Sequence, residues 1–158
     1  MDNLGKLPTV FARKCVARRL DREAAAEFLN RHHRMGDATS RYRYGLFAAD
    51  AAAGDSPLAV ATFSNARTMR DGTRSYEWIR YASRDGIRVV GGMGKLLETF
   101  VQDVHPGDVM TYVDASVSDG SSYLELGFEP AGTVVRGSFT NLKFRKRYIQ
   151  AAPQDQAI

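Results

Sequence analysis

Short stretches of alternating apolar and polar residues run along most of this chain, and helical spacing replaces them in a few places. Strict alternation favours half-buried strands, whereas apolar residues three and four positions apart favour helices. The strands that this pattern predicts cover about residues 11–20, 44–49, 58–63, 75–82, 109–113, 133–136 and 142–149. A short extended segment, Val89-Val90, precedes a run of glycines.

Three helices are predicted between these strands, over residues 22–33, 95–104 and 119–126. Asp21 precedes the first helix, where its carboxylate is placed to accept from the free amides of the first turn. Gly127 follows the third helix, at a position that often adopts the left-handed conformation. The order β-α-β-β-β-α-β-α-β-β indicates the α/β (α+β) class, with a single mixed, mostly antiparallel sheet and flanking helices.

The length and composition are those of one globular domain. The chain has 158 residues, of which 44% are hydrophobic and 25% are charged, and we assign residues 1–150 to the domain and 151–158 to a disordered tail. No apolar run is long enough to span a membrane. The single cysteine, Cys15, excludes an internal disulfide and any multi-cysteine metal site. We expect a cytoplasmic protein, and we assign no metal-binding residues, although the sequence does not decide whether a metal is used.

The charge is mildly basic, with 22 Lys and Arg against 18 Asp and Glu and a formal net charge of +4. This excess is smaller than that of a dedicated nucleic-acid binder. It is unevenly spread, with clusters at Arg13, Lys14, Arg18 and Arg19, at Arg31, Arg34, Arg41 and Arg43, and at Lys143, Arg145, Lys146 and Arg147. The clusters favour anionic partners, such as the phosphates of a cofactor or of nucleic acid. They fit solvated strand and helix faces equally well.

The strongest local motif is the glycine-rich junction RVVGGMGK, residues 88–95. Glycines allow a backbone to approach a ligand closely, and the helix that follows directs free amides and its positive dipole end toward an anion. A pyrophosphate is the expected occupant, although a Gly-Gly turn is often only a tight connection. The predicted cofactor-binding residues are Arg88, Val90, Gly91, Gly92, Gly94 and Lys95.

A second motif, Tyr123-x-x-x-Gly127-Phe128, follows the strand that ends near Asp114. With the glycine junction, it resembles the GCN5-related N-acetyltransferase superfamily in element order over roughly residues 11–149. That resemblance implies an N-acetyltransferase-like fold, a transferase activity, and acetyl-CoA or a related acyl-CoA as cofactor.

The glycine junction matches the motif of that superfamily, Gln/Arg-x-x-Gly-x-Gly/Ala, with one departure. Arg88 and Gly91 occupy its first and fourth positions, whereas Met93 stands in place of the small sixth residue. A shift by one residue aligns the glycines at 92 and 94 and leaves Val89 as the mismatch.

A narrower resemblance points to a phage-associated branch that includes relatives of the Mom DNA-modification protein, which converts adenine to a carbamoylmethyl derivative. It is carried by residues 76–80 (YEWIR), the glycine junction, residues 112–114 (YVD) and the Tyr123 motif. The resemblance implies functional roles for Arg80, Asp114 and Tyr123. The serine that this branch has within the turn is replaced by Gly94.

Four residues are candidates for catalysis. Tyr123 is suited to protonate a departing thiolate, or it packs the third helix against the sheet. Asp114 is suited to act as a base or orient an amine, or it is a turn residue. Glu77 and Arg80 face opposite sides of a regular strand. The superfamily resemblance implies a water-mediated base near Glu77, and either residue is otherwise a paired surface charge.

Candidate substrate-binding residues lie nearer the N-terminus. His32 and His33 end the first helix, where they line a substrate cleft or are simply helix-end residues. Tyr42 and Tyr44, interleaved with two arginines, are placed to stack on a nucleobase. The alternative is an alternating, half-buried strand.

Three functions follow from these observations. The first is transfer of a group to a base in DNA, and the second is acetylation of a small amine or a protein lysine. The third is a non-catalytic nucleic-acid-binding module. The sequence decides neither the acceptor, nor the transferred group, nor whether the chain forms a homodimer.

Overall fold

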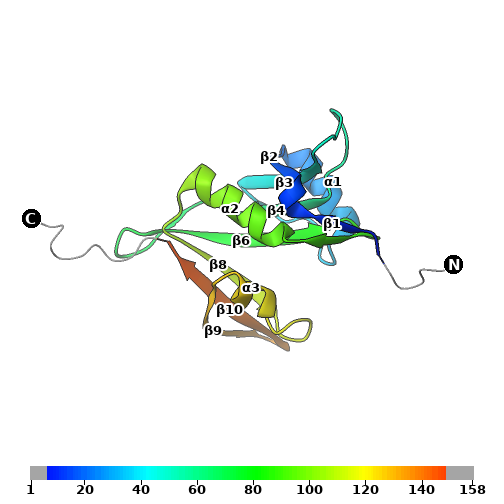
Figure 1. Ribbon diagram of the computed structural model, residues 1–158. Coiled ribbons are helices and arrows are strands. Elements are labelled where there is room, and N and C mark those ends of the chain that lie inside the picture. Colours follow the sequence, from blue (N-terminus) through cyan, green and yellow to red (C-terminus); the bar gives the residue numbers. More distant parts are fainter. Residues whose placement is uncertain (1–6, 149–158) are drawn as a thin grey trace, which may run out of the picture. The chain divides into compact units, whose positions relative to one another are not determined.

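The computed structural model describes residues 7–148, and the predicted tail lies outside them. In chain order, the elements are β1 (Thr9–Phe11), the 3-10 helix η1 (Ala12–Lys14), β2 (Cys15–Arg19), α1 (Arg22–His32), β3 (Tyr42–Ala48), β4 (Ala59–Phe63), β5 (Arg67–Thr68), β6 (Arg74–Ser83), β7 (Arg88–Val90), α2 (Gly92–Val104), β8 (Asp108–Asp114), α3 (Ser121–Glu125), β9 (Glu129–Arg136) and β10 (Phe139–Arg147) (Figure 1). The described chain divides into two compact units, 7–64 with 79–104 and 65–78 with 105–148.

In the first unit, β2, β3 and β4 form an antiparallel ladder that continues to β6. Val60 of β4 is buried against α1 through Phe28 and Leu29. Phe63 of the same strand stacks on Phe100 of α2, with ring centroids 4.0 Å apart. Because side chains alternate along a strand, α1 and α2 cover opposite faces of the sheet. Both faces of β4 are therefore buried.

The predicted start of α1 is confirmed. Asp21 Oδ1 accepts from the backbone N of Ala24 at 2.7 Å, and the helix begins at Arg22.

Removal of this cap by Asp21→Ala is expected to lower the free energy of unfolding by about 1 kcal/mol. Chemical denaturation would measure the loss. Asp50→Ala, which removes an exposed carboxylate from a loop, is the control and should change stability far less. Equal losses in both variants would contradict the capping role.

In the second unit, the strand order is β6-β8-β10-β9. β6 and β8 pair in parallel from Ser75↔Asp108 to Glu77↔Met110, whereas β10 pairs antiparallel with both β8 and β9. The prediction of a mixed, mostly antiparallel sheet with flanking helices is confirmed. The core of this unit contains an aromatic cluster, which we define as Trp78, Tyr123, Phe128 and Phe144.

Two predicted elements differ from the structure. The strand predicted over 11–20 is two strands separated by η1, because the amide of Cys15 turns back to donate to the carbonyl of Ala12. Lys95 Nζ also donates to the carbonyls of Ala12 and Cys15. The third helix is shorter than predicted and spans Ser121–Glu125, because Gly120 before it adopts φ +80° and Asp119 Oδ1 accepts from the amide of Ser121 at 2.9 Å in a turn outside the helix. Within residues 7–148, no helix is both long and apolar enough to cross a membrane.

Candidate functional site

The glycine junction connects β7 to α2 in the first unit. Gly91 adopts φ +80°, in the left-handed region that favours glycine. The first helical hydrogen bond runs from the amide of Lys95 to the carbonyl of Gly91, at 3.0 Å. The amides of residues 92–94 precede that bond and have no acceptor within the helix. Three N–H groups and the positive end of the helix dipole thus converge on the junction.

Gly92 is buried, and a side chain does not fit there. A Cβ at this position would overlap Tyr81 Oη and would lie 2.9 Å from Val89 Cγ1. A larger residue would therefore require these side chains or the first turn of α2 to move. The local feature that fits a pyrophosphate cradle is the set of free amides at residues 92–94, and Gly92 allows this turn to pack closely against Tyr81 and Val89.

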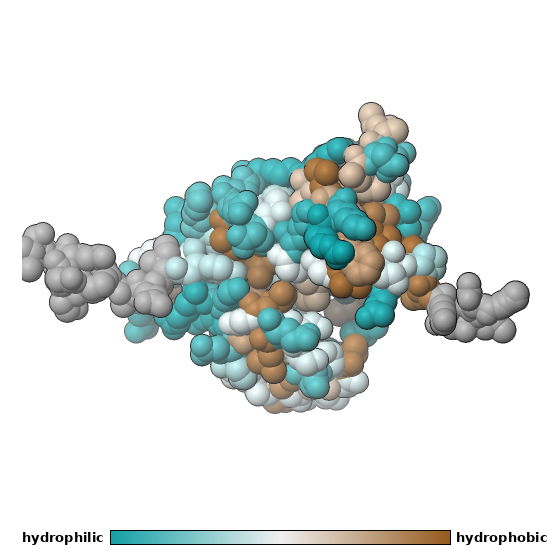
Figure 2. Space-filling view, viewed as in Figure 1, coloured by the Kyte–Doolittle hydropathy of each residue, from teal (hydrophilic) through white to brown (hydrophobic). Residues whose placement is uncertain are grey.

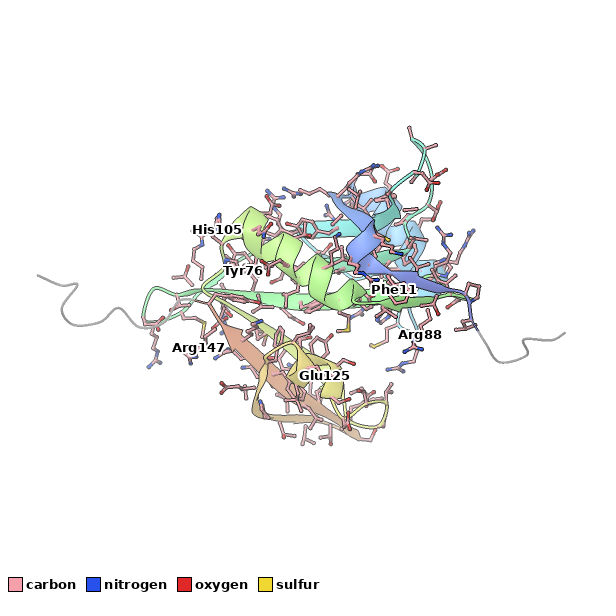
Figure 3. All side chains as sticks on the ribbon, in the orientation of Figure 1. Phe11, Tyr76, Arg88, His105, Glu125 and Arg147 are labelled. Carbon is pink, nitrogen blue, oxygen red and sulfur yellow. The ribbon has the colours of Figure 1, made fainter. Side chains whose placement is uncertain are left out.

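The flanking residues of the junction have different surroundings. Arg88 and Val90 are exposed and lie on β7, which pairs in parallel with β1 (Figure 3). Lys95 Nζ donates to the carbonyls of Ala12, at 3.0 Å, and Cys15. Its ammonium thus anchors η1 beside the start of α2. Arg13 and Lys14 of η1 are exposed, and Figure 2 shows hydrophilic side chains gathered over this segment.

The two tyrosines of β3 are not equivalent. Tyr44 is fully buried, and its hydroxyl donates to Asp103 Oδ2 at 2.6 Å. Burial and then this hydrogen bond raise the pKa of Tyr44 above its usual range. A role in stacking on a nucleobase does not fit Tyr44, because helices cover both faces of the sheet. Tyr42 is partly exposed and lies between the guanidinium groups of Arg19 and Arg41.

The two adjacent histidines have different partners. His32 Nδ1 accepts from the amide of Asp85 at 3.0 Å. His33 Nδ1 accepts from the amide of Met35 at 2.9 Å and lies in the field of Arg80. Arg80 Nε in turn donates to the carbonyl of Gly36 at 2.9 Å. The structure thus brings together two predicted residues, His33 and Arg80, beside the loop that follows α1.

The pKa of His33 is lowered, first by burial and then by the positive charges of Arg80 and Arg34. The folded state thus disfavours the imidazolium, while the unfolded chain takes up a proton at about pH 6.5. Stability from this group is present above pH 6.5 and is lost as the pH falls toward the lowered pKa.

We expect His33→Asn to reduce the slope of unfolding free energy against pH between about 6.5 and 5. His105→Asn, at an exposed loop position, is the control, and an unchanged slope in the His33 variant would contradict this assignment.

Tyr123 lies in α3 of the second unit, within the aromatic cluster. Its ring contacts Trp78 edge-to-face at 5.3 Å and Phe128 at 5.5 Å between centroids. Burial raises the pKa of its phenol, and a hydrogen bond with Thr111 opposes that shift. The phenol therefore stays protonated at neutral pH, as a proton donor must. Thr111, which also donates to the carbonyl of Trp78 at 3.0 Å, was not apparent as a site residue from the pattern.

Asp114 and Glu77 also belong to the second unit. Asp114 Oδ1 accepts from both the amide of Ser116, at 2.9 Å, and its hydroxyl, at 2.7 Å. This is the turn geometry considered as an alternative to catalysis. Glu77 is partly buried on β6 and pairs in register with Met110. Within the described part of the chain, no three His, Cys, Asp or Glu side chains gather in a way that would hold a metal ion.

Comparison with known proteins identifies similar folds among solved structures. They include the ribosomal-protein-S18-alanine N-acetyltransferase from Escherichia coli, Naa50 of Arabidopsis thaliana in complex with the bisubstrate analogue CoA-Ac-MVNAL, and the NatB acetyltransferase complex bound to CoA and MES. Their sequence identities to this chain are 15%, 9% and 12%, and their TM-scores are 0.62, 0.62 and 0.65. The matches cover 89%, 85% and 84% of this chain and 97%, 99% and 98% of those chains.

No protein-family model and no curated protein matches the sequence. At these identities the structural matches establish the fold, which is that of the N-acetyltransferases. They give no support to the narrower resemblance to the Mom branch.

Proposed function

We propose that this chain is an N-acetyltransferase that binds acetyl-CoA at the glycine junction and transfers the acetyl group to an amine. The observation that carries the proposal is the start of α2, where Gly91 has φ +80° and the amides of residues 92–94 have no acceptor within the helix. Two of the similar structures contain CoA or a CoA-based analogue, which supports the same cofactor here.

The residues of the junction would hold the pyrophosphate. The amides of Gly92, Met93 and Gly94 would donate to its oxygens, and the exposed Arg88 adds positive charge nearby. Lys95 contributes by anchoring η1. Acetyl-CoA, when bound, supplies an activated thioester, and the chain's own residues bind it, orient it and move protons.

Four residues are proposed to serve the transfer. Tyr123 is proposed to donate its phenolic proton to the departing sulfur, since a phenol is protonated at neutral pH. Glu77 is the proposed base that removes a proton from the acceptor amine through water. Asp114 and Arg80 are proposed to position the acceptor. These roles rest on the resemblance of the motifs and on the surroundings of each residue within its own unit.

A second candidate is transfer of a group to adenine in DNA. The basic residues Arg19 and Arg41 beside the partly exposed Tyr42 favour it, because an aromatic ring flanked by arginines suits a base and its phosphate. A non-catalytic nucleic-acid-binding module is the third candidate. A homodimer and a cytoplasmic location are predictions that accompany all three.

One experiment separates these candidates. The protein is incubated with acetyl-CoA and either a panel of amines and lysine peptides or DNA, and release of free thiol is measured. Products are then identified by mass spectrometry of the peptides and of the digested nucleosides. Acetylated amine supports the proposed function, and a modified adenine supports the second candidate. No release of thiol from acetyl-CoA with either acceptor contradicts both and favours the non-catalytic module.

A further inference from the structure

A hollow of about 460 Å³ lies in the second unit, at the turn that joins β5 to β6. Four arginines line it, Arg67, Arg70, Arg145 and Arg147, with two aspartates, Asp71 and Asp108. Thr68, Met69 and Thr73 complete the lining. Two backbone hydrogen bonds close the turn, from the amide of Met69 to the carbonyl of Thr73 at 2.8 Å and from the amide of Gly72 to the carbonyl of Met69 at 2.9 Å. The hollow is thus built from a defined hairpin and the end of β10.

The aspartates do not neutralise this hollow. Asp108 is 3% exposed. Its Oδ2 lies 3.4 Å from Arg145 Nε, so the negative charge of Asp108 is paired with the positive charge of Arg145 in the lining of the hollow. Asp108 Oδ1 and Arg145 Nε are buried and make no hydrogen bond within the described residues. Burial of such polar atoms costs free energy unless an opposite charge lies nearby. Asp71 is ionised, because hydrogen bonds from Thr73 lower its pKa and Arg147 adds to the shift. Four arginines against two aspartates leave an excess of positive charge.

A second hollow, of about 440 Å³, shares two of these arginines. Arg145 and Arg147 also line this space, together with Lys146, the acidic residue Glu129, and Gly127, Pro130 and Ala131. Arg147 lies at the end of β10 (Figure 3). The two hollows share Arg145 and Arg147, and we define the basic track as the cationic residues that line them: Arg67, Arg70, Arg145, Lys146 and Arg147. The ring of Tyr148 lies 5.3 Å from Lys146 Nζ, beside the same track.

We propose that this basic track binds the phosphate groups of a nucleic-acid strand. Arginine forks match phosphate oxygens in pairs, linked phosphates match adjoining hollows, and an aromatic ring beside the track suits a base. The buried Asp108 is a positioning residue that orients Arg145. The proposal concerns the second unit alone and goes beyond acetyl transfer, so it stands or falls independently of acetyl-CoA binding.

The test is fluorescence polarisation with a labelled single-stranded oligonucleotide of about ten nucleotides, without acetyl-CoA and at several salt concentrations. The test variant is R67A/R70A. The matched control is R31A/R136A, which also removes two exposed arginines. We expect the test variant to bind the oligonucleotide about tenfold more weakly at 0.1 M salt. The slope of log K against the logarithm of the salt concentration should become shallower by about 1.4, because two phosphate contacts are lost. The control should change little in both quantities.

Competition identifies the ligand. Unlabelled oligonucleotide is expected to displace the probe at micromolar concentration, and inorganic phosphate and polyglutamate are expected to need far more. Equal weakening of both double variants would overturn the proposal, since it would show a response to net charge alone. Displacement by inorganic phosphate or by polyglutamate as readily as by oligonucleotide would overturn the assignment to a nucleic-acid strand. Thermal melts of both variants confirm that each is folded.

Discussion

Replacement of Gly92 by alanine is expected to weaken binding of CoA by about 100-fold. A change of this size corresponds to the loss of about two charge-assisted hydrogen bonds. The added methyl group would overlap Tyr81 Oη and approach Val89 Cγ1 to 2.9 Å. These side chains or the first turn of α2 must then move, and we expect the turn to shift and carry its free amides away from the pyrophosphate. Overpacking of this kind also costs about 1–3 kcal/mol of stability. Calorimetric titration with CoA and chemical denaturation measure the two effects.

Gly72→Ala is the control for this experiment. Gly72 has φ +87° and no atom within 4 Å of an added Cβ, so the substitution strains a turn by about 1 kcal/mol without crowding it. It should bind CoA as the unaltered protein does. If Gly92→Ala also binds CoA normally, the glycine junction is only a tight connection between strand and helix, and the proposed cofactor site is wrong.

The second large effect is expected at Tyr123. Tyr123→Phe removes the phenolic proton but keeps the ring that packs on Trp78 and Phe128. We expect kcat to fall at least 100-fold, with little change in KM for acetyl-CoA. Because burial raises the pKa of Tyr123, the unaltered enzyme should lose no activity through this group until the pH is above 10. A steady-state pH profile measures both expectations.

Tyr112→Phe is the matched control for Tyr123→Phe. Tyr112 is 40% exposed on β8, and loss of its hydroxyl should leave kcat unchanged. A Tyr123→Phe variant that keeps full kcat and remains folded would show that Tyr123 only packs α3 against the sheet.

The sequence predicted the local features of the fold well. Alternation predicts the strands of the sheet because a strand with one covered face needs a period of two. Asp21 and Gly127 marked helix ends because a cap requires a particular oxygen and a particular backbone angle. The cap bond of Asp21 and the φ of +93° at Gly127 confirm both.

Contacts between distant segments could not be predicted in this way. Tyr44 and Asp103 are 59 residues apart, and nothing in the spacing of either shows that α2 covers β3 and buries the tyrosine. Lys95 gives a similar case. Its positive charge at the start of a helix predicts a contact with the phosphates of a ligand, whereas its ammonium donates to the carbonyls of Ala12 and Cys15, about 80 residues earlier in the chain. The spacing of apolar residues indicates which face of a strand or helix is apolar, but it does not indicate which other segment of the chain covers that face.

The most direct test of the central claim is an NMR titration of the 15N-labelled protein with acetyl-CoA, with pantetheine as the ligand that lacks the pyrophosphate. The cradle requires that the amides of Gly92, Met93 and Gly94 become donors to the ligand. We predict that acetyl-CoA shifts these resonances more than any others in α2 and that pantetheine does not. Unchanged amide resonances over residues 91–95 at saturating acetyl-CoA, or equal shifts with pantetheine, would contradict the account.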